Sequence, residues 1–156
     1  MKNISFGKSG PLLSVTIEHG VIKLLLCQGI KVLGHKVLPA NPRFFREGLV
    51  TNGIRVASII QNALQQMDMG PLRRVVGASH GFQGNLRLLE LPRSRGLDPK
   101  MFIPQEARRI MGVSPETTQL VWHRLPDRLD RTRWLVATAA RRAVASLVDT
   151  TQRAGL

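Results

Sequence analysis

The residues with the clearest potential for chemistry lie in a turn inside the stretch LLSVTIEHGVIKLLL, residues 12–26. Glu18, His19 and Gly20 separate two apolar runs, and Lys23 follows three residues later. Glycine turns beside a lysine can hold a phosphate, because backbone N–H groups and the ammonium both favour an anion. The carboxylate of Glu18 argues against an anion at the same place. Three interpretations are therefore open at this stage: a phosphate-binding loop, a degenerate one, or a plain hairpin.

Other catalytic arrangements have less support in the sequence. Four histidines are far apart and lack the spacing of metal ligands: His19, His35, His80 and His123. Ser79 precedes a histidine and a glycine, but no Gly-x-Ser-x-Gly frame surrounds it. Cys27 is the single cysteine and lies in an apolar run, so we expect a buried, unreactive thiol in a reducing compartment. No catalytic residue and no metal site is predicted.

Charge is the most unusual feature of the composition. The 156 residues include 23 Lys and Arg against 10 Asp and Glu, a formal net charge of +13. Such an excess is typical of proteins that meet nucleic acid, an anionic membrane or an acidic partner. Aromatic residues make up only 4%, with no Tyr, which disfavours a base-stacking surface. No apolar run reaches the roughly 18 residues of a membrane span, and we expect a soluble globular chain.

Residue periodicity in the first half predicts a strand meander followed by a helix. β-Branched and apolar runs bounded by turn residues predict strands over 12–17, 21–28, 30–38 and 74–79. Asn52 is the expected cap of a helix whose apolar residues recur at helical spacing up to Met67. Gly70 and Pro71 are expected to stop that helix.

The second half predicts a strand, a helix, two strands and a final helix. The expected strands cover 85–91, 119–125 and 133–138, with a charged hairpin loop over 126–132. Asp98 and Pro99 predict a helix start and Gly112 its end. The stripe expected to be buried on this helix contains Ile103, Ala107, Ile110 and Met111. The final helix, 141–154, is expected to point Val144, Leu147 and Val148 inward.

This order of elements resembles the first half of PilM, the actin-like protein of type IV pilus assembly and a relative of FtsA. The segments that carry the resemblance are Glu47–Val50, Leu89–Pro92, Leu135–Arg141 and Arg153–Leu156. The resemblance implies an α/β fold: an actin-like (ribonuclease H-like) half-lobe with an SHS2-type strand–helix–strand–strand insert. It implies a first actin-like part over 1–81, the insert over 82–139, and a helix returning to the actin-like part over 140–156.

The resemblance also bears on the turn. PilM proteins carry a loop of the type Asp-Ile-Gly-Ser-Ser-Ser-Val-Lys there, which binds the phosphates and magnesium of ATP. Alignment on Lys23 puts Thr16 in the place of the aspartate and Glu18 in the place of the glycine, with His19 and Gly20 on serines. The resemblance therefore implies a degenerate phosphate loop. With the second lobe of the fold also missing from this chain, we expect no enzyme activity, no cofactor and no metal.

The function that the resemblance implies is that of a non-catalytic scaffold in a type IV pilus or competence-type assembly platform. PilM-like proteins bind the short cytoplasmic N-terminal tail of PilN, an inner-membrane protein. We expect a similar groove walled by 74–79, by 83–89 and by the helix from Pro99. The expected partner-binding residues are Leu86, Arg87, Leu88, Lys100, Arg108 and Arg109. For Leu86 and Leu88 the alternative is that both pack under the insert helix.

Two other functions stay open: a basic nucleic-acid-binding module, and a cytoplasmic domain of the GspL type from a secretion system. The expected location is the cytoplasm, at the inner face of the cytoplasmic membrane. A weak contact with anionic membrane lipids and homo-oligomerisation are also left open, whereas no specific nucleic acid is expected.

Overall fold

A computed structural model of the chain describes residues 10–18, 20–67, 74–79, 84–92 and 98–156. The chain divides into two compact units: unit 1, residues 1–82 with 145–156, and unit 2, residues 83–144. The boundaries predicted from the sequence lie after residues 81 and 139. The predicted helix stop at Gly70–Pro71 lies outside the described residues.

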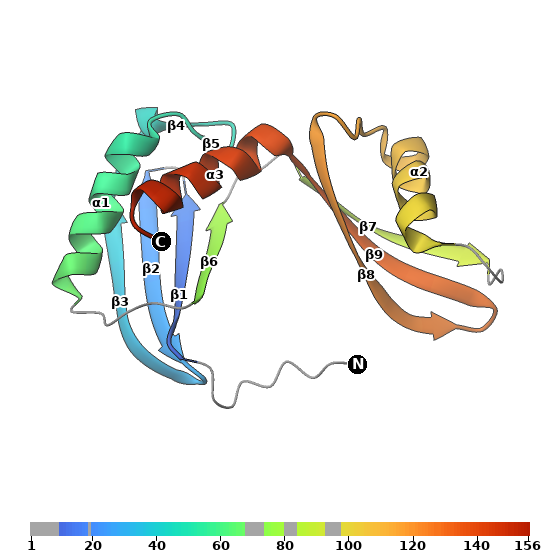
Figure 1. Cartoon of the computed structure of the whole chain (residues 1–156), viewed down its shortest axis with the longest axis horizontal. Coiled ribbons are helices and arrows are strands. Elements are labelled where there is room, and N and C mark those ends of the chain that lie inside the picture. The colour runs from blue at the N-terminus through green and yellow to red at the C-terminus, as the bar shows by residue number, and fades with distance from the viewer. Residues whose placement is uncertain (1–9, 19, 68–73, 80–83, 93–97) are drawn as a thin grey trace. The chain divides into compact units, whose positions relative to one another are not determined.

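Unit 1 is built on a four-stranded sheet with the order β3-β2-β1-β6 (Figure 1). Its strands are β1 (Leu12–Glu18), β2 (Val21–Gln28), β3 (Lys31–Pro39) and β6 (Arg74–Ser79). The first three form an antiparallel meander, and β6 pairs in parallel with β1. The predicted strands are confirmed, except that Ile30 lies in the β2–β3 turn and is fully exposed.

One face of this sheet carries the core of unit 1. Alternate residues of β1, including Leu13 and Val15, are fully buried, as expected for a strand with one covered face. Helix α1 (Gly53–Gln66) covers that face with Val56 and Ile60. Helix α3 (Arg141–Arg153) adds Leu147 to the same cluster, and Figure 1 shows α1 and α3 on one side of the sheet.

A small hairpin connects the meander to α1. It follows the 3₁₀ turn η1 (Pro42–Phe44) and consists of β4 (Phe45–Arg46) and β5 (Leu49–Val50). Its two turn residues, Glu47 and Gly48, have φ of 51° and 77°, as type I′ hairpin turns require. The Asn52 side chain accepts a hydrogen bond from the N–H of Arg55 at 3.2 Å, which confirms the predicted cap of α1.

Unit 2 is a three-stranded antiparallel sheet with one helix. In chain order it contains β7 (Gly84–Pro92), α2 (Pro99–Met111), β8 (Thr118–Arg128) and β9 (Arg131–Ala140). The strand–helix–strand–strand order is the predicted one, and the sheet order is β7-β9-β8. Asp98 caps α2 by accepting a hydrogen bond from the N–H of Lys100 at 2.9 Å. Gly112 ends the helix with φ of 62°, a left-handed cap that glycine adopts without strain.

Helix α2 packs on one face of this sheet. The core there consists of Leu89, Ile103, Ala107 and Val136, with Met111, Leu120, Trp122 and Trp134 around it. Ile110 was predicted to be buried but is 48% exposed. The buried stripe follows Ile103, Ala107 and Met111 at intervals of four residues, which leaves Ile110 at its border.

Two further predictions were wrong in detail. Val148 on α3 was predicted to point inward but is 45% exposed, because the inward stripe of α3 runs through Ala143, Leu147 and Thr150. The hairpin loop predicted over 126–132 is a two-residue turn, since β8 continues to Arg128 and β9 begins at Arg131. The charges of this segment suggested a loop, but exposed strand ends also carry charged residues.

Candidate functional site

The turn between β1 and β2 contains the residues predicted to be the remains of a phosphate loop. Lys23 Nζ lies 2.7 Å from Glu18 Oε1, so the lysine already has an anionic partner within the hairpin. Thr16 lies directly across from Lys23 in the β1–β2 ladder. Both charged side chains are partly exposed, and such a pair contributes about 0–1 kcal/mol to stability. His19 lies outside the described residues.

The backbone of the turn is held by the segment after β3. The N–H of Ala40 donates to the carbonyl of Gly20 at 2.9 Å. Gly20 has φ of 81°, and a Cβ there would lie 3.5 Å from both the Ala40 carbonyl oxygen and Pro42 Cγ. Glycine is favoured here by its positive φ. Within the described residues, the turn has the features of a packed hairpin whose single lysine is neutralised by a neighbour.

The face of the unit 2 sheet opposite α2 is a more promising site, and we call it the open face. Residues directly across from one another in an antiparallel ladder share a face. Since Leu89 and Val136 face α2, their sequence neighbours on each strand face the other way. The open face therefore contains Leu86, Leu88, Glu90, Val121, His123, Leu125, Arg133, Leu135 and Ala137.

Apolar side chains form two adjacent rows across the open face. Leu86, Ala137 and Val121 are direct partners across the three strands, and Leu88 lies opposite Leu135 in the next row. Leu86 is 64% exposed, Val121 56% and Leu88 44%. Contiguous exposed apolar groups are typical of interaction surfaces, whereas single ones are ordinary.

The structure decides whether Leu86 and Leu88 pack under the helix of unit 2, a question that the sequence left open. Leu86 and Leu88 do not pack under α2, because Leu89 takes that position. Val121 was not identified from the sequence, although its alternation within β8 was readable. The missing information was which face of β8 the helix covers, since both faces carry apolar residues.

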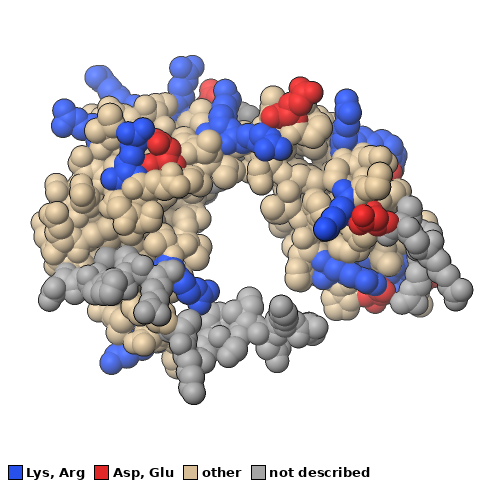
Figure 2. All heavy atoms as spheres, in the orientation of Figure 1, with Lys and Arg blue, Asp and Glu red and all other residues tan. Residues whose placement is uncertain are grey.

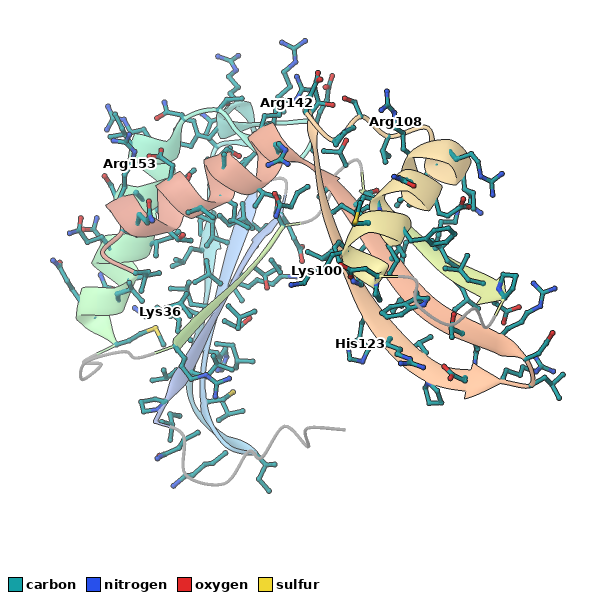
Figure 3. All side chains as sticks on the ribbon, turned by 45° about the vertical axis from the view of Figure 1, so that its right-hand side comes forward. Lys36, Lys100, Arg108, His123, Arg142 and Arg153 are labelled. Carbon is teal, nitrogen blue, oxygen red and sulfur yellow. The ribbon has the colours of Figure 1, made fainter. Side chains whose placement is uncertain are left out.

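The basic residues predicted to join Leu86 and Leu88 lie elsewhere on unit 2. Arg87 is directly across from Val136 and so belongs to the α2 side of the sheet. Lys100, Arg108 and Arg109 are on α2 itself, with Lys100 near its start and Arg108 near its end (Figure 3). The six predicted residues therefore occupy two faces of unit 2 instead of one continuous surface.

The arginines of α2 differ in how strongly they are already engaged. Arg109 Nη2 lies 2.6 Å from Glu106 Oε2, and its Nε also donates to that carboxylate. This hydrogen bonding lowers the pKa of Glu106 and raises the pKa of Arg109. Neither Lys100 nor Arg108 has an ion-pair partner among the residues that the structure describes. Of the two arginines, Arg108 therefore has the charge more available to a partner.

The fold of the chain is a known one. The chain is similar to a chain of a PilM–PilN type IV pilus biogenesis complex, with a TM-score of 0.77 and 23% sequence identity over 93% of this chain and 45% of that one. It is also similar to the cytoplasmic domain of EpsL, an inner-membrane component of the type II secretion system of Vibrio cholerae. There the TM-score is 0.58 and the identity 12%, over 94% of this chain and 54% of that one.

These similarities establish the mixed α/β fold. The chain spans about half the length of each of these two structures. No protein-family model matches the sequence, and no curated protein matches it significantly.

The described residues contain no group of three or more His, Cys, Asp or Glu that could hold a metal ion. None of the helices they form is both long and apolar enough to cross a membrane.

Unit 2 also has a pocket of about 540 Å³, lined by Thr118, Thr138, Glu116 and Arg141 among others. Arg141 is already engaged there, because its Nε donates to the Pro115 carbonyl at 3.1 Å.

Proposed function

We propose that this chain is a non-catalytic scaffold of a type IV pilus or competence-type assembly platform. In this proposal it binds the cytoplasmic N-terminal tail of a PilN-like inner-membrane protein. The observation that carries the proposal is the similarity, over 93% of the chain, to a chain of a PilM–PilN complex. The weaker similarity to EpsL favours a closely related second candidate, a cytoplasmic domain of a GspL-like secretion protein.

The proposal includes a finer assignment of the fold and of the location. Unit 1 corresponds to part of an actin-like lobe, with its strand meander, its parallel strand β6 and its covering helices. Unit 2 corresponds to an SHS2-type insert, with its strand–helix–strand–strand order. A protein that binds the tail of an inner-membrane partner works in the cytoplasm, at the inner face of that membrane.

Unit 2 supports tail binding through its surface chemistry. In the sheet order β7-β9-β8, β7 has a neighbour on one side only among the described strands. An extended peptide can pair with such an edge through main-chain hydrogen bonds, while pockets on the sheet select its side chains. Leu86 and Leu88 extend from the same edge strand onto the open face. The apolar side chains of a tail paired with β7 would contact them.

Charge supports an acidic or carboxylate-bearing partner. Figure 2 shows Lys and Arg side chains spread over both units, with fewer Asp and Glu among them. The net charge of +13 attracts acidic tails over long range and raises the association rate more than the affinity. Arg108, exposed on α2, adds a local contribution to this field.

The proposed scaffold does not use a nucleotide. The Glu18–Lys23 ion pair supports this, because an incoming phosphate would have to displace a carboxylate that lies 2.7 Å from the lysine. A phosphate beside Glu18 would also be repelled by a like charge. We propose that this turn has a structural role only.

The experiment is a titration of a fluorescently labelled synthetic tail of the PilN-like protein against the chain, followed by anisotropy. The expected result is saturable binding by the wild type. The Arg108→Glu, Arg109→Glu variant should bind more weakly and associate more slowly. Its melting temperature should fall only slightly, because the Glu106–Arg109 pair that it loses lies at the surface. No binding by the wild type would refute the proposed function. Equal affinities would exclude the basic helix from binding and leave the open face as the site.

A further inference from the structure

The turn between β8 and β9 has an unusual residue at its tip. Leu129 is 90% exposed, and its φ is 53°. Positive φ brings the Cβ of an L-residue close to its own backbone, so that leucine is strongly disfavoured there. Full exposure leaves an apolar side chain in water as well. Both properties disfavour leucine at this position as far as the stability of the isolated chain is concerned.

The same chain contains a matched turn with the expected residue. The β2–β3 turn also has two residues, Gly29 and Ile30, between a directly paired Gln28 and Lys31. Its first turn residue is a glycine with φ of 61°. Leu129 holds the equivalent first position between the paired Arg128 and Arg131. Glu47 holds the same position in the β4–β5 hairpin with φ of 51°, but its exposed side chain is charged and suited to water. An exposed leucine at such a position has no such compensation and points to a contact outside the fold.

Two like charges flank the tip of the turn, which also disfavours this sequence in the isolated chain. Arg128 and Arg131 lie directly across from each other at the base of the turn, and like charges at such positions repel. Both are exposed, and neither has an ion-pair partner among the described residues. The neighbouring Arg124 differs, because it pairs with Asp127 at 2.9 Å. Asp130 is the one acidic residue within the turn.

We propose that this tip, residues 128–131, inserts into the surface of an anionic lipid bilayer. Leu129 would enter the boundary between headgroups and acyl chains, while Arg128 and Arg131 bind lipid phosphates on either side of it. One guanidinium group can bind two oxygens of a phosphate through two parallel hydrogen bonds. Arginines beside an inserted apolar residue are typical of membrane-surface contacts. Binding to an anionic bilayer would bury the Leu129 side chain and, at the same time, offset the repulsion between Arg128 and Arg131 with negative charge. Nucleic acid and free phosphate could bind the two arginines, but neither has an apolar region that would bury the leucine side chain.

The experiment measures co-sedimentation of the whole chain with vesicles of phosphatidylcholine containing about one third phosphatidylglycerol, at physiological ionic strength. The decisive variant is Leu129→Gly, which keeps the charge and suits the positive φ. We expect its vesicle affinity to fall about tenfold, as loss of a buried leucine predicts, while its melting temperature is no lower than that of the wild type. The matched control is Ile30→Gly, which removes a comparably exposed aliphatic residue from the two-residue β2–β3 turn and should bind as the wild type does.

A second pair of variants separates a local contact from general attraction. Arg128→Gln with Arg131→Gln should weaken binding more than tenfold, at about fivefold for each charge near the surface. Arg43→Gln with Arg55→Gln removes the same charge from exposed positions of unit 1 and should weaken binding only slightly. The proposal is overturned if the wild type does not sediment with the anionic vesicles, or if Leu129→Gly binds them as well as the wild type. Equal losses for the two arginine pairs would also overturn it, because they would show attraction by net charge alone.

Discussion

Replacement of Leu86 and Leu88 by serine tests most directly whether the open face binds the tail of the PilN-like partner. The exposed parts of the two side chains, 64% and 44%, together amount to about one whole leucine. Complete burial of one leucine stabilises a complex by about 1.5–3 kcal/mol. This range corresponds to about 10- to 150-fold in the dissociation constant. A bound tail covers the surface only in part, so we expect the double variant to bind the tail about tenfold more weakly.

The same substitutions should leave the fold almost unchanged. Exposed substitutions usually alter the free energy of unfolding by no more than about 0.5 kcal/mol. For a chain of this size that corresponds to a shift of about 1–2 °C in the melting temperature. A larger decrease would show that the two leucines support the fold, and the loss of affinity would then say nothing about a contact.

A matched control is available on the opposite side of unit 2. Met101 and Ile110 are 68% and 48% exposed on α2, close to the values for Leu86 and Leu88. Their replacement by serine removes a similar apolar area from the other face. We measure the affinity for the labelled tail by anisotropy titration of the wild type and both double variants. The open face would be excluded as the binding site if the two double variants bound the tail equally well.

Four further outcomes are expected. Calorimetry with Mg-ATP should detect no binding, because Lys23 is already ion-paired with Glu18. Saturable binding tighter than millimolar would contradict the proposed structural role of the turn. Duplex DNA should bind without sequence preference and with an affinity that falls steeply as salt rises; tight binding in a filter assay at physiological salt would instead favour a nucleic-acid-binding module. Ile103→Ala should lower the free energy of unfolding of unit 2 by about 2–5 kcal/mol, seen in a denaturant titration followed by tryptophan fluorescence, and unchanged unfolding would contradict the described core. The pKa of Glu106 is lowered by its hydrogen bond to Arg109, so the pair should stabilise the fold above the ordinary carboxyl pKa and lose that contribution as the pH falls through the lowered value; a Glu106→Gln variant with the same acid unfolding curve would show that the pair contributes nothing.

The amino-acid sequence by itself determined most of the secondary structure. The limits of β2 and β6, the Asn52 and Asp98 caps and the Gly112 stop depend on residues within a few positions of one another. Alternation and helical spacing are local properties in the same sense, so that they can be read without the tertiary structure. The strand–helix–strand–strand order of unit 2 followed from these signals alone.

The tertiary structure decided which of two apolar faces is buried. Strand β7 has Leu86 and Leu88 on one face and Leu89 on the other, and the sequence does not say which face α2 covers. That choice depends on long-range packing, in which Ile103 and Ala107 of α2 share a core with Leu89 and Val136, bordered by the two tryptophans of β8 and β9. The strained position of Leu129 likewise depends on the register between β8 and β9. From the sequence, Leu129 is expected within a longer loop. Local chemistry therefore specified the elements, and packing between distant segments specified the surfaces on which the proposed contacts depend.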